Sequence, residues 1–236
     1  MKYAFISSMN EEYYTKHGNV MLSSFSKFND KYTMYLYNED FSPVYNNIIL
    51  KGWNLGIEYL NFQNAWPEKS SVSKFSKKGF SIIDAMYTID CDYLIWIDAD
   101  CEIKKTFDNN LLNEIANDDI LSSHFSVWHL KNNEIYHSRE TGFFVLNKKH
   151  SKFKKFREIY KKIYVNQEME NLRRFYDGDV YGETVNQLDD TYMNNLNTGK
   201  HKTPIPRSIL KDYVSHFKGK GLKDKILNNI PKDDKC

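Results

Sequence analysis

The chain has 236 residues, 41% of them hydrophobic, which is enough to bury one sizeable core, so we expect a single domain over residues 1–236. The formal net charge of +2 argues against extensive binding to duplex DNA, although the stretch 218–235, with six Lys against three Asp, is locally basic and leads into a predicted basic tail at residues 224–236. No run approaches about 20 apolar residues, which excludes a predicted membrane span. The three cysteines lack metal-site spacing and predict reduced thiols in a cytoplasmic protein.

The first part of the chain predicts an alternation of strands and helices. Residues 2–8 favour a strand that follows Met1 without the apolar core of a signal peptide, and residues 11–28 carry a helical stripe. Further strands are predicted at residues 32–37 and 57–60, and a helix at residues 73–89. This order predicts an α/β fold with a largely parallel sheet and right-handed crossovers.

The second part continues the alternation. Helices are predicted over residues 106–115, 153–164 and 183–196, strands over residues 120–125 and 140–147, and a polar turn over residues 175–181. Gly142, near the start of the strand at 140–147, has two interpretations: a residue without Cβ allows a close approach of the backbone to a ligand, or it marks a bulge.

The apolar run Tyr93–Ile97 ends abruptly in two carboxylates, Asp98 and Asp100. A short run of this kind predicts a strand buried on both faces, so its first charges should fall at the edge of the sheet, where open α/β sheets bind ligands. Two acids in the turn beyond a strand can converge on one divalent cation.

The turn with Asp98 and Asp100 has four interpretations. It can be a solvated turn, since Asp-x-Asp is common by chance. A calcium loop of the EF-hand type is excluded because Ile103 replaces the glycine and Asn109 the glutamate that such a loop needs. A haloacid-dehalogenase-like phosphatase has Asp-x-Asp followed by Thr or Val, whereas Glu102 stands here. The fourth interpretation is a nucleotide-sugar transferase, in which a metal bridges the acids and a diphosphate. It requires further motifs elsewhere in the chain.

Four short segments have the residue types that such a transferase requires, in this order along the chain: Asp98-Ala-Asp100, Glu140-Thr-Gly142, Asp177-Gly-Asp179 and residues 215–223. Together they resemble the GT-A-fold glycosyltransferases, especially family 8 with its viral and bacterial relatives, over about residues 3–223. The resemblance implies a Rossmann-like, mostly parallel central sheet flanked by helices, with a C-terminal helical segment.

The resemblance also implies site residues. Asp98 and Asp100 would hold Mn²⁺ or Mg²⁺, and His216 would complete the metal site; an imidazole beside carboxylates favours Mn²⁺. The region from Ser7 to Tyr13 would border the base. The candidate phosphate-binding residues are Lys78, Lys218, Gly219, Lys220 and Lys223. Here Leu222 occupies the position of the family's phosphate lysine, and Lys223 follows it.

Asp177 and Asp179 would face the sugar or the acceptor as catalytic residues, as a base or as stabilisers of an oxocarbenium-like state. Gly178 stands where the family has a glutamine, which leaves the stereochemical outcome open. The expected activity is therefore transfer of a sugar from a nucleotide diphosphate donor to a hydroxyl of a saccharide, a protein or a modified DNA base. The alternative is a sugar-nucleotide-binding module without turnover.

Overall fold

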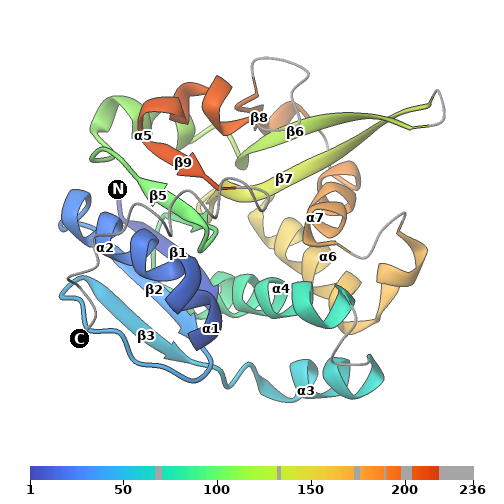
Figure 1. Cartoon of the computed structure of the whole chain (residues 1–236). Coiled ribbons are helices and arrows are strands. Elements are labelled where there is room, and N and C mark those ends of the chain that lie inside the picture. Colours follow the sequence, from blue (N-terminus) through green and yellow to red (C-terminus); the bar gives the residue numbers. More distant parts are fainter. Residues whose placement is uncertain (67–70, 132–133, 173–175, 189, 198–203, 218–236) are drawn as a thin grey trace.

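The computed structural model describes residues 1–66, 71–131, 134–172, 176–188, 190–197 and 204–217 (Figure 1). Its centre is a seven-stranded sheet in the order β3-β2-β1-β4-β7-β6-β8. The strands are β1 (Tyr3–Met9), β2 (Thr33–Asn38), β3 (Ile48–Gly52), β4 (Tyr93–Ile97), β6 (Ser122–Lys131), β7 (Glu134–Asn147) and β8 (Met193–Asn195). The strands from β3 to β4 are parallel, β7 runs antiparallel to both of its neighbours, and β6 and β8 are parallel, so the sheet is mostly parallel as expected.

Helices cover both faces of the sheet and give three layers, because alternate residues of the central strands belong to two separate apolar clusters. One face packs against α3 (Gly56–Ala65), α4 (Ser71–Thr88), α6 (Phe153–Val165) and α7 (Asp177–Asn186). The other face packs against α2 (Asn19–Phe28) and α5 (Asn109–Ile115). A short α1 (Glu11–Tyr13) and a π-helical turn at Tyr14–Gly18 lead directly into α2. Among the described residues, the structure contains no helix long and apolar enough to cross a membrane.

The run Tyr93–Ile97 forms β4, and all five of its residues are buried, as the sequence predicts. Leu94 and Trp96 face one apolar cluster, while Ile95 and Ile97 face the other. The first three strands build outward on one side of β1, and α4 then returns the chain to β4 on its other side. The carboxyl ends of β1 and β4 therefore meet where the strand order reverses, which is where open α/β sheets bind ligands.

A second, two-stranded sheet lies beyond β4. It consists of β5 (Cys101–Ile103) and β9 (Val214–His216), which pair antiparallel (Figure 1). The expected C-terminal helical segment is represented in the described part of the chain by three short 3₁₀ helices, at Asp190–Tyr192, Ile205–Arg207 and Ile209–Asp212. The last two pack against the same face of the main sheet as α5, whereas Tyr192 of the first packs against the opposite face.

Three local predictions were wrong. Residues 57–60 lie in α3, whose buried residues Tyr59 and Phe62 pack on α4 and α6, and the third parallel strand is β3, which the sequence analysis missed. The predicted turn at 175–181 contains the first half of α7, which begins at Asp177. The helix predicted over 183–196 ends at Asn186, because the chain then forms β8 and pairs with β6. Tertiary pairing overrides local propensity there.

Candidate functional site

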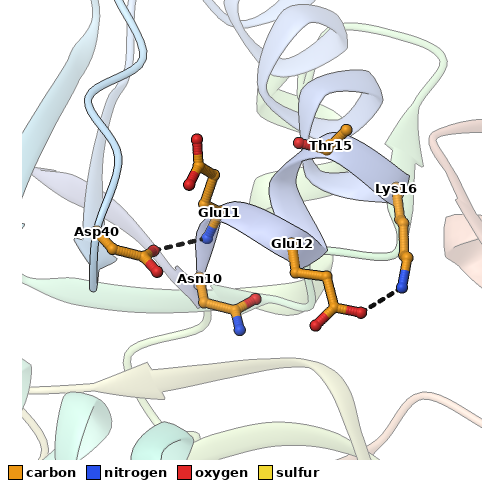
Figure 2. Close-up of a pocket in the computed structure, with 6 residues that line it drawn as sticks. All are labelled: Asn10, Glu11, Glu12, Thr15, Lys16 and Asp40. Atoms are coloured by element: carbon orange, nitrogen blue, oxygen red, sulfur yellow. Dashed lines mark hydrogen bonds and ion pairs between the residues drawn. The ribbon is translucent and has the colours of Figure 1, made fainter.

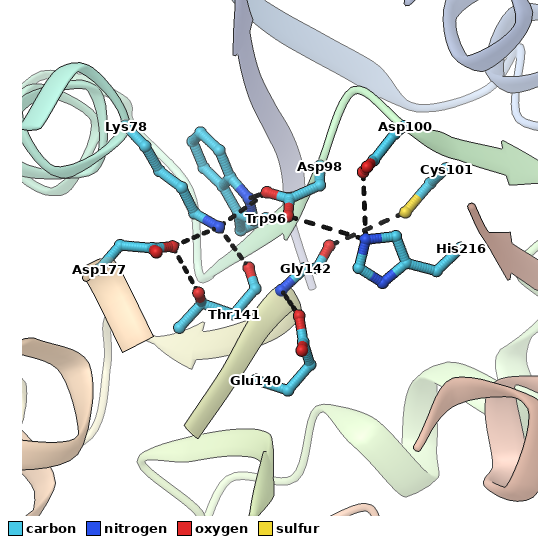
Figure 3. A network of polar contacts seen from close by, with 10 residues as sticks. All are labelled: Lys78, Trp96, Asp98, Asp100, Cys101, Glu140, Thr141, Gly142, Asp177 and His216. Atoms are coloured by element: carbon cyan, nitrogen blue, oxygen red, sulfur yellow. Dashed lines mark hydrogen bonds and ion pairs between the residues drawn. The ribbon is translucent and has the colours of Figure 1, made fainter. Parts of the chain in front are cut away.

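The two acids after β4 lie next to an imidazole from the far end of the described chain. Residues 98–100 form a tight turn in which the Cys101 N–H donates to the Asp98 carbonyl at 3.1 Å. The chain then enters β5, where Cys101 lies opposite His216 of β9. This pairing places His216 Nε2 3.1 Å from Asp100 Oδ1 and 4.0 Å from Asp98 Oδ2 (Figure 3). The structure thus brings together the three residues for which the sequence suggests metal binding.

Gly142 makes this approach possible. A Cβ at this position would lie 2.5 Å from His216 Cε1, so any other residue would push the imidazole away. The Gly142 carbonyl also accepts from the Asp98 N–H at 2.8 Å and fixes the start of the turn. The register between β6 and β7 shifts between Ser123 and Phe125, opposite the segment that contains Gly142. The register shift supports the interpretation as a bulge, and the group that approaches Gly142 closely is the His216 imidazole.

Glu140 also lies in this cluster, although nothing in the sequence pattern marks it as a metal ligand. Its Oε1 accepts from the Gly142 N–H at 3.0 Å. Two sets of three potential metal ligands have atoms all within 4.8 Å of one another: Asp98, Glu140 and His216, and Asp100, Cys101 and His216. His216 belongs to both sets. An acid at the start of the strand predicted over 140–147 is a weak signal, and the position of Glu140 follows only from the pairing of β7 with β4 and β6.

On the other side of Asp98, Lys78 of α4 bridges two carboxylates. Its Nζ lies 2.7 Å from Asp98 Oδ1 and 2.8 Å from Asp177 Oδ2, and it donates to the Thr141 carbonyl at 2.7 Å (Figure 3). The Trp96 indole N–H donates to the same Asp98 oxygen at 2.7 Å. The Thr141 hydroxyl donates to Asp177. The predicted catalytic acid Asp177 and the metal-binding acid Asp98 are therefore joined through one buried lysine.

The pKa values follow from burial and from these neighbours. Burial raises the pKa of Asp98, and with Asp100 and Asp177 nearby it outweighs the opposing effects of Lys78 and His216. Burial would lower the pKa of Lys78, but the two carboxylates Asp177 and Asp98 raise it well above its usual range. Burial would raise the pKa of Asp177, but the ion pair with Lys78 and the hydrogen bonds that Asp177 accepts hold it below its usual range. Lys78 and Asp177 are thus a charged pair at neutral pH, and the charge of Asp98 is poorly compensated.

The donor set fits a divalent metal ion. Four carboxylates lie here, from Asp98, Asp100, Glu140 and Asp177, against one lysine and one imidazole. Ligands about 2.0–2.2 Å from one ion lie roughly 3–4.4 Å from each other, which matches the distances from His216 to Asp100 and Asp98. A mixture of imidazole nitrogen and carboxylate oxygen suits Mn²⁺ better than Mg²⁺.

The remaining candidate residues lie in different places. Ser7 is fully buried in β1, one position beyond the pairing of Ile6 with Trp96, and its hydroxyl has no hydrogen-bond partner in the described part of the chain. Asp179 lies in the first turn of α7 and is half-buried. Residues two apart on a helix point about 200° apart, so Asp177 and Asp179 face different sides of α7. The candidates Lys218, Gly219, Lys220 and Lys223, and the basic tail, lie outside the described residues.

A cavity of about 470 Å³ opens at the carboxyl ends of β1 and β2. It is lined by Asn10, Glu11, Glu12, Thr15, Lys16 and Asp40 (Figure 2). The Glu11 N–H donates to Asp40 Oδ1 at 2.8 Å, which joins the two strand ends. Within the same segment, Tyr13 points to the acids: burial, the charges of Asp100 and Asp98 and a hydrogen bond to Asp100 raise the pKa of its hydroxyl. Tyr13, which follows the lining residues Glu11 and Glu12 in the chain, therefore lies beside the acidic cluster.

Comparison with solved structures identifies the fold, whereas the sequence comparisons find no match. No protein-family model matches the chain, and no curated protein matches it by sequence. The solved structure of the galactosyltransferase LgtC, in complex with donor and acceptor sugar analogs, is similar with a TM-score of 0.58 at 14% identity, covering 92% of this chain and 87% of that one.

Two other solved structures are also similar. The bifunctional glycosyltransferase WbbM gives a TM-score of 0.55 at 12% identity over 93% of this chain and 46% of its own. Mouse xyloside xylosyltransferase 1 gives 0.52 at 11% identity over 84% of this chain and 86% of its own. At such identities a likeness establishes the fold: this chain has the fold of the GT-A glycosyltransferases.

Proposed function

We propose that the chain is a metal-dependent glycosyltransferase that moves a sugar from a nucleotide diphosphate donor to an acceptor hydroxyl. One observation carries the proposal: Asp98, Asp100 and His216 meet at the carboxyl end of the central strand of a GT-A fold. The acids and the imidazole would hold Mn²⁺. The GT-A fold gives no support to the phosphatase interpretation of Asp-x-Asp.

Breaking the bond between the sugar and the phosphate leaves a nucleoside diphosphate with added negative charge. A bound metal ion would stabilise this charge as a Lewis acid. The chain's own contribution is a preorganised arrangement of charges: Lys78 and the Trp96 indole fix one Asp98 oxygen, so the other oxygen can face the ion. We further propose that Lys218, Gly219, Lys220 and Lys223 fold over the phosphates.

Asp177 is proposed to act on the sugar side of the same network. It lies at the first position of α7, is buried and stays ionised beside Lys78. A fixed negative charge near the reacting carbon would stabilise an oxocarbenium-like state. Asp179 faces another side of the helix and is proposed to contact the acceptor.

The cavity at the ends of β1 and β2 is proposed to take the nucleoside, because it borders the segment from Ser7 to Tyr13. Its lining includes the acids Glu11, Glu12 and Asp40, with Lys16 paired to Glu12. Carboxylates accept hydrogen bonds from ribose hydroxyls and base N–H groups but repel phosphates. The diphosphate would therefore lie on the side of the metal ligands.

A second candidate function is a sugar-nucleotide-binding module without turnover. It is favoured by Gly178, which replaces the glutamine that glycosyltransferases of family 8 have between the two acids. In the structure this glycine is required for packing, because a Cβ would lie 2.3 Å from the Arg139 carbonyl oxygen. A residue that packs a helix on a strand offers no side chain to the sugar.

A donor-hydrolysis assay tests the proposal because it needs no acceptor. The chain is incubated with a panel of nucleotide sugars in Mn²⁺ or in a chelator, and the released nucleoside diphosphate is measured. We expect Mn²⁺-dependent release from one donor class, and its loss in Asp100→Ala. Binding of the donor without release by the wild-type chain would favour the binding module, and the absence of both would refute the proposed function.

A further inference from the structure

The cluster contains a thiol that the proposed reaction does not use. Cys101 is 1% exposed and follows Asp100 directly. It is the cross-strand partner of His216 in the β5–β9 pair, and its Sγ lies 4.0 Å from the Gly142 carbonyl oxygen (Figure 3). We infer that Asp100, Cys101 and His216 form a second metal position, selective for Zn²⁺ and similar thiophilic ions, which shares Asp100 and His216 with the proposed Mn²⁺ position.

The three ligand atoms lie close enough together for one zinc ion to draw them in. One ligand atom from each of Asp100, Cys101 and His216 lies within 4.8 Å of the others. Zinc bonds of about 2.0 Å to oxygen and nitrogen and 2.3 Å to sulfur place tetrahedral ligands roughly 3.3–3.6 Å apart. The 3.1 Å between His216 Nε2 and Asp100 Oδ1 is already near this value. Three protein ligands would leave the fourth position open, as in zinc sites that accept water or a substrate oxygen.

The two sets differ in the chemistry of their donors. Asp98, Glu140 and His216 offer oxygen and nitrogen, whereas Asp100, Cys101 and His216 add sulfur. Thiolate is a soft ligand that selects Zn²⁺, and a given site also binds Zn²⁺ more tightly than Mn²⁺ in the ordinary order of divalent affinities. The second set should therefore strongly prefer Zn²⁺, Cd²⁺ or Co²⁺ to Mn²⁺.

Because His216 and Asp100 are shared, Zn²⁺ at this position removes ligands from Mn²⁺. If the proposed function holds, Zn²⁺ then inhibits donor cleavage in competition with Mn²⁺, and this inhibition depends on Cys101. The binding itself does not rest on the proposed function, because it can be measured without any donor.

Spectroscopy with Co²⁺ and Cd²⁺ tests the thiolate bond. The sequence has three cysteines, so Cys91→Ser with Cys236→Ser leaves Cys101 as the single thiol. Adding Co²⁺ or Cd²⁺ to this variant should give a thiolate-to-metal charge-transfer absorption with a stoichiometry of one ion per chain. The further change Cys101→Ser should abolish the band, and the wild-type chain should lose it with Cys101→Ser alone. Absence of the band from the wild-type chain would overturn the inference.

Calorimetry then separates the two positions. We expect Cys101→Ser to weaken Zn²⁺ binding at least about tenfold, while Mn²⁺ binding changes less than about threefold. Cys91→Ser is the matched control, because it replaces the other described cysteine, which lies outside the cluster. Equal Zn²⁺ affinity in the wild type and Cys101→Ser would refute the second position. Mn²⁺-dependent donor cleavage, measured separately, reports on the proposed function alone. A failure of the zinc position can therefore be told apart from a failure of the proposed function.

Discussion

Lys78 ties the two halves of the site together, because its ammonium group lies between the carboxylates of Asp98 and Asp177. Both Lys78 and Asp177 have side chains only 11% exposed, so their attraction is weakly screened by water. Removing one charge from such a pair leaves the other buried and poorly compensated. The two acids of α7 should therefore differ in their effect on stability.

We expect Asp177→Asn to reduce the free energy of unfolding by about 2 kcal/mol, less than for an isolated buried pair because Lys78 keeps Asp98. Asp179→Asn should change it by less than about 0.5 kcal/mol, since Asp179 is half-buried on another side of the helix. Urea denaturation measures both. Turnover should fall by roughly a hundredfold in Asp177→Asn if its charge stabilises the transition state. Equal stability of the two variants would contradict the role of the Lys78 bridge.

The same pair predicts a pH dependence. The pKa of Asp177 is lower in the folded state than in the unfolded chain, so its contribution to stability is present above the unfolded value and is lost as pH falls through the folded value. The difference in unfolding free energy between the wild type and Asp177→Asn should be constant above about pH 5 and should shrink progressively as the pH falls below the ordinary aspartate value of about 3.9. Denaturation at a series of pH values checks this. A difference that persists undiminished at pH 2 would rule out the ionic origin.

The individual acids could be predicted from the sequence, but their pairing could not. Asp98 and Asp100 stand out because they end an apolar run, and His216 because glycines and lysines surround it. That Lys78 bridges Asp98 and Asp177 depends on where α4 and α7 pack, and the role of Glu140 depends on the register of β7. Such contacts join residues far apart in the chain, which a pattern along one segment does not encode.

At the scale of the element, α7 carries two glycines one turn apart with different constraints. A Cβ on Gly178 would lie 2.3 Å from a backbone oxygen of β7, whereas one on Gly182 would lie 3.5 Å from the Arg139 Cγ, an ordinary contact. We expect Gly182→Ala to stabilise the fold by about 0.5–1 kcal/mol, because alanine favours helix. Gly178→Ala should destabilise it by roughly 1–3 kcal/mol and displace Asp177. Urea denaturation of both variants provides the comparison, and similar effects would contradict the close packing of α7 on β7.

Elements with strong patterns were predicted well, and those that depend on partners were not. The continuous apolar run of β4 and the amphipathic stripe of α6 are local signals, and both appear as expected. The segment 177–196 reads as turn and then helix, but becomes α7, a 3₁₀ helix and β8. Strand β8 forms because the edge of β6 is open to pairing. This is a property of the assembled sheet and not of residues 193–195.

At the scale of the whole molecule, an excess of carboxylates at one end of the sheet should couple metal binding to folding. An ion that binds only the folded state stabilises it by about 2.7 kcal/mol at a concentration 100 times its dissociation constant. For a chain of 236 residues this corresponds to a rise in Tm of roughly 5–10 °C. We expect Mn²⁺ to produce such a rise, measured by thermal denaturation with and without chelator. Asp100→Ala should show a much smaller rise, and an equal one would place the ion elsewhere.

Because β9 is the last described strand, the main sheet can form before the metal-binding residues are all in place. The main sheet has all its strands by Asn195, but His216 joins Asp100 across 116 positions of sequence through strands of only three residues each. During synthesis, a sheet with its acids in place would therefore exist before the imidazole arrives, and until then it would hold a cation with oxygen ligands alone. In the finished molecule β9 pairs with β5 through only three residues, so we expect it to open more readily than β4, the central strand of the main sheet. We expect the amide hydrogens of β9 to exchange with deuterium much faster than those of Tyr93–Ile97. Exchange at equal rates would show that the β5–β9 pair and the main sheet open as one unit.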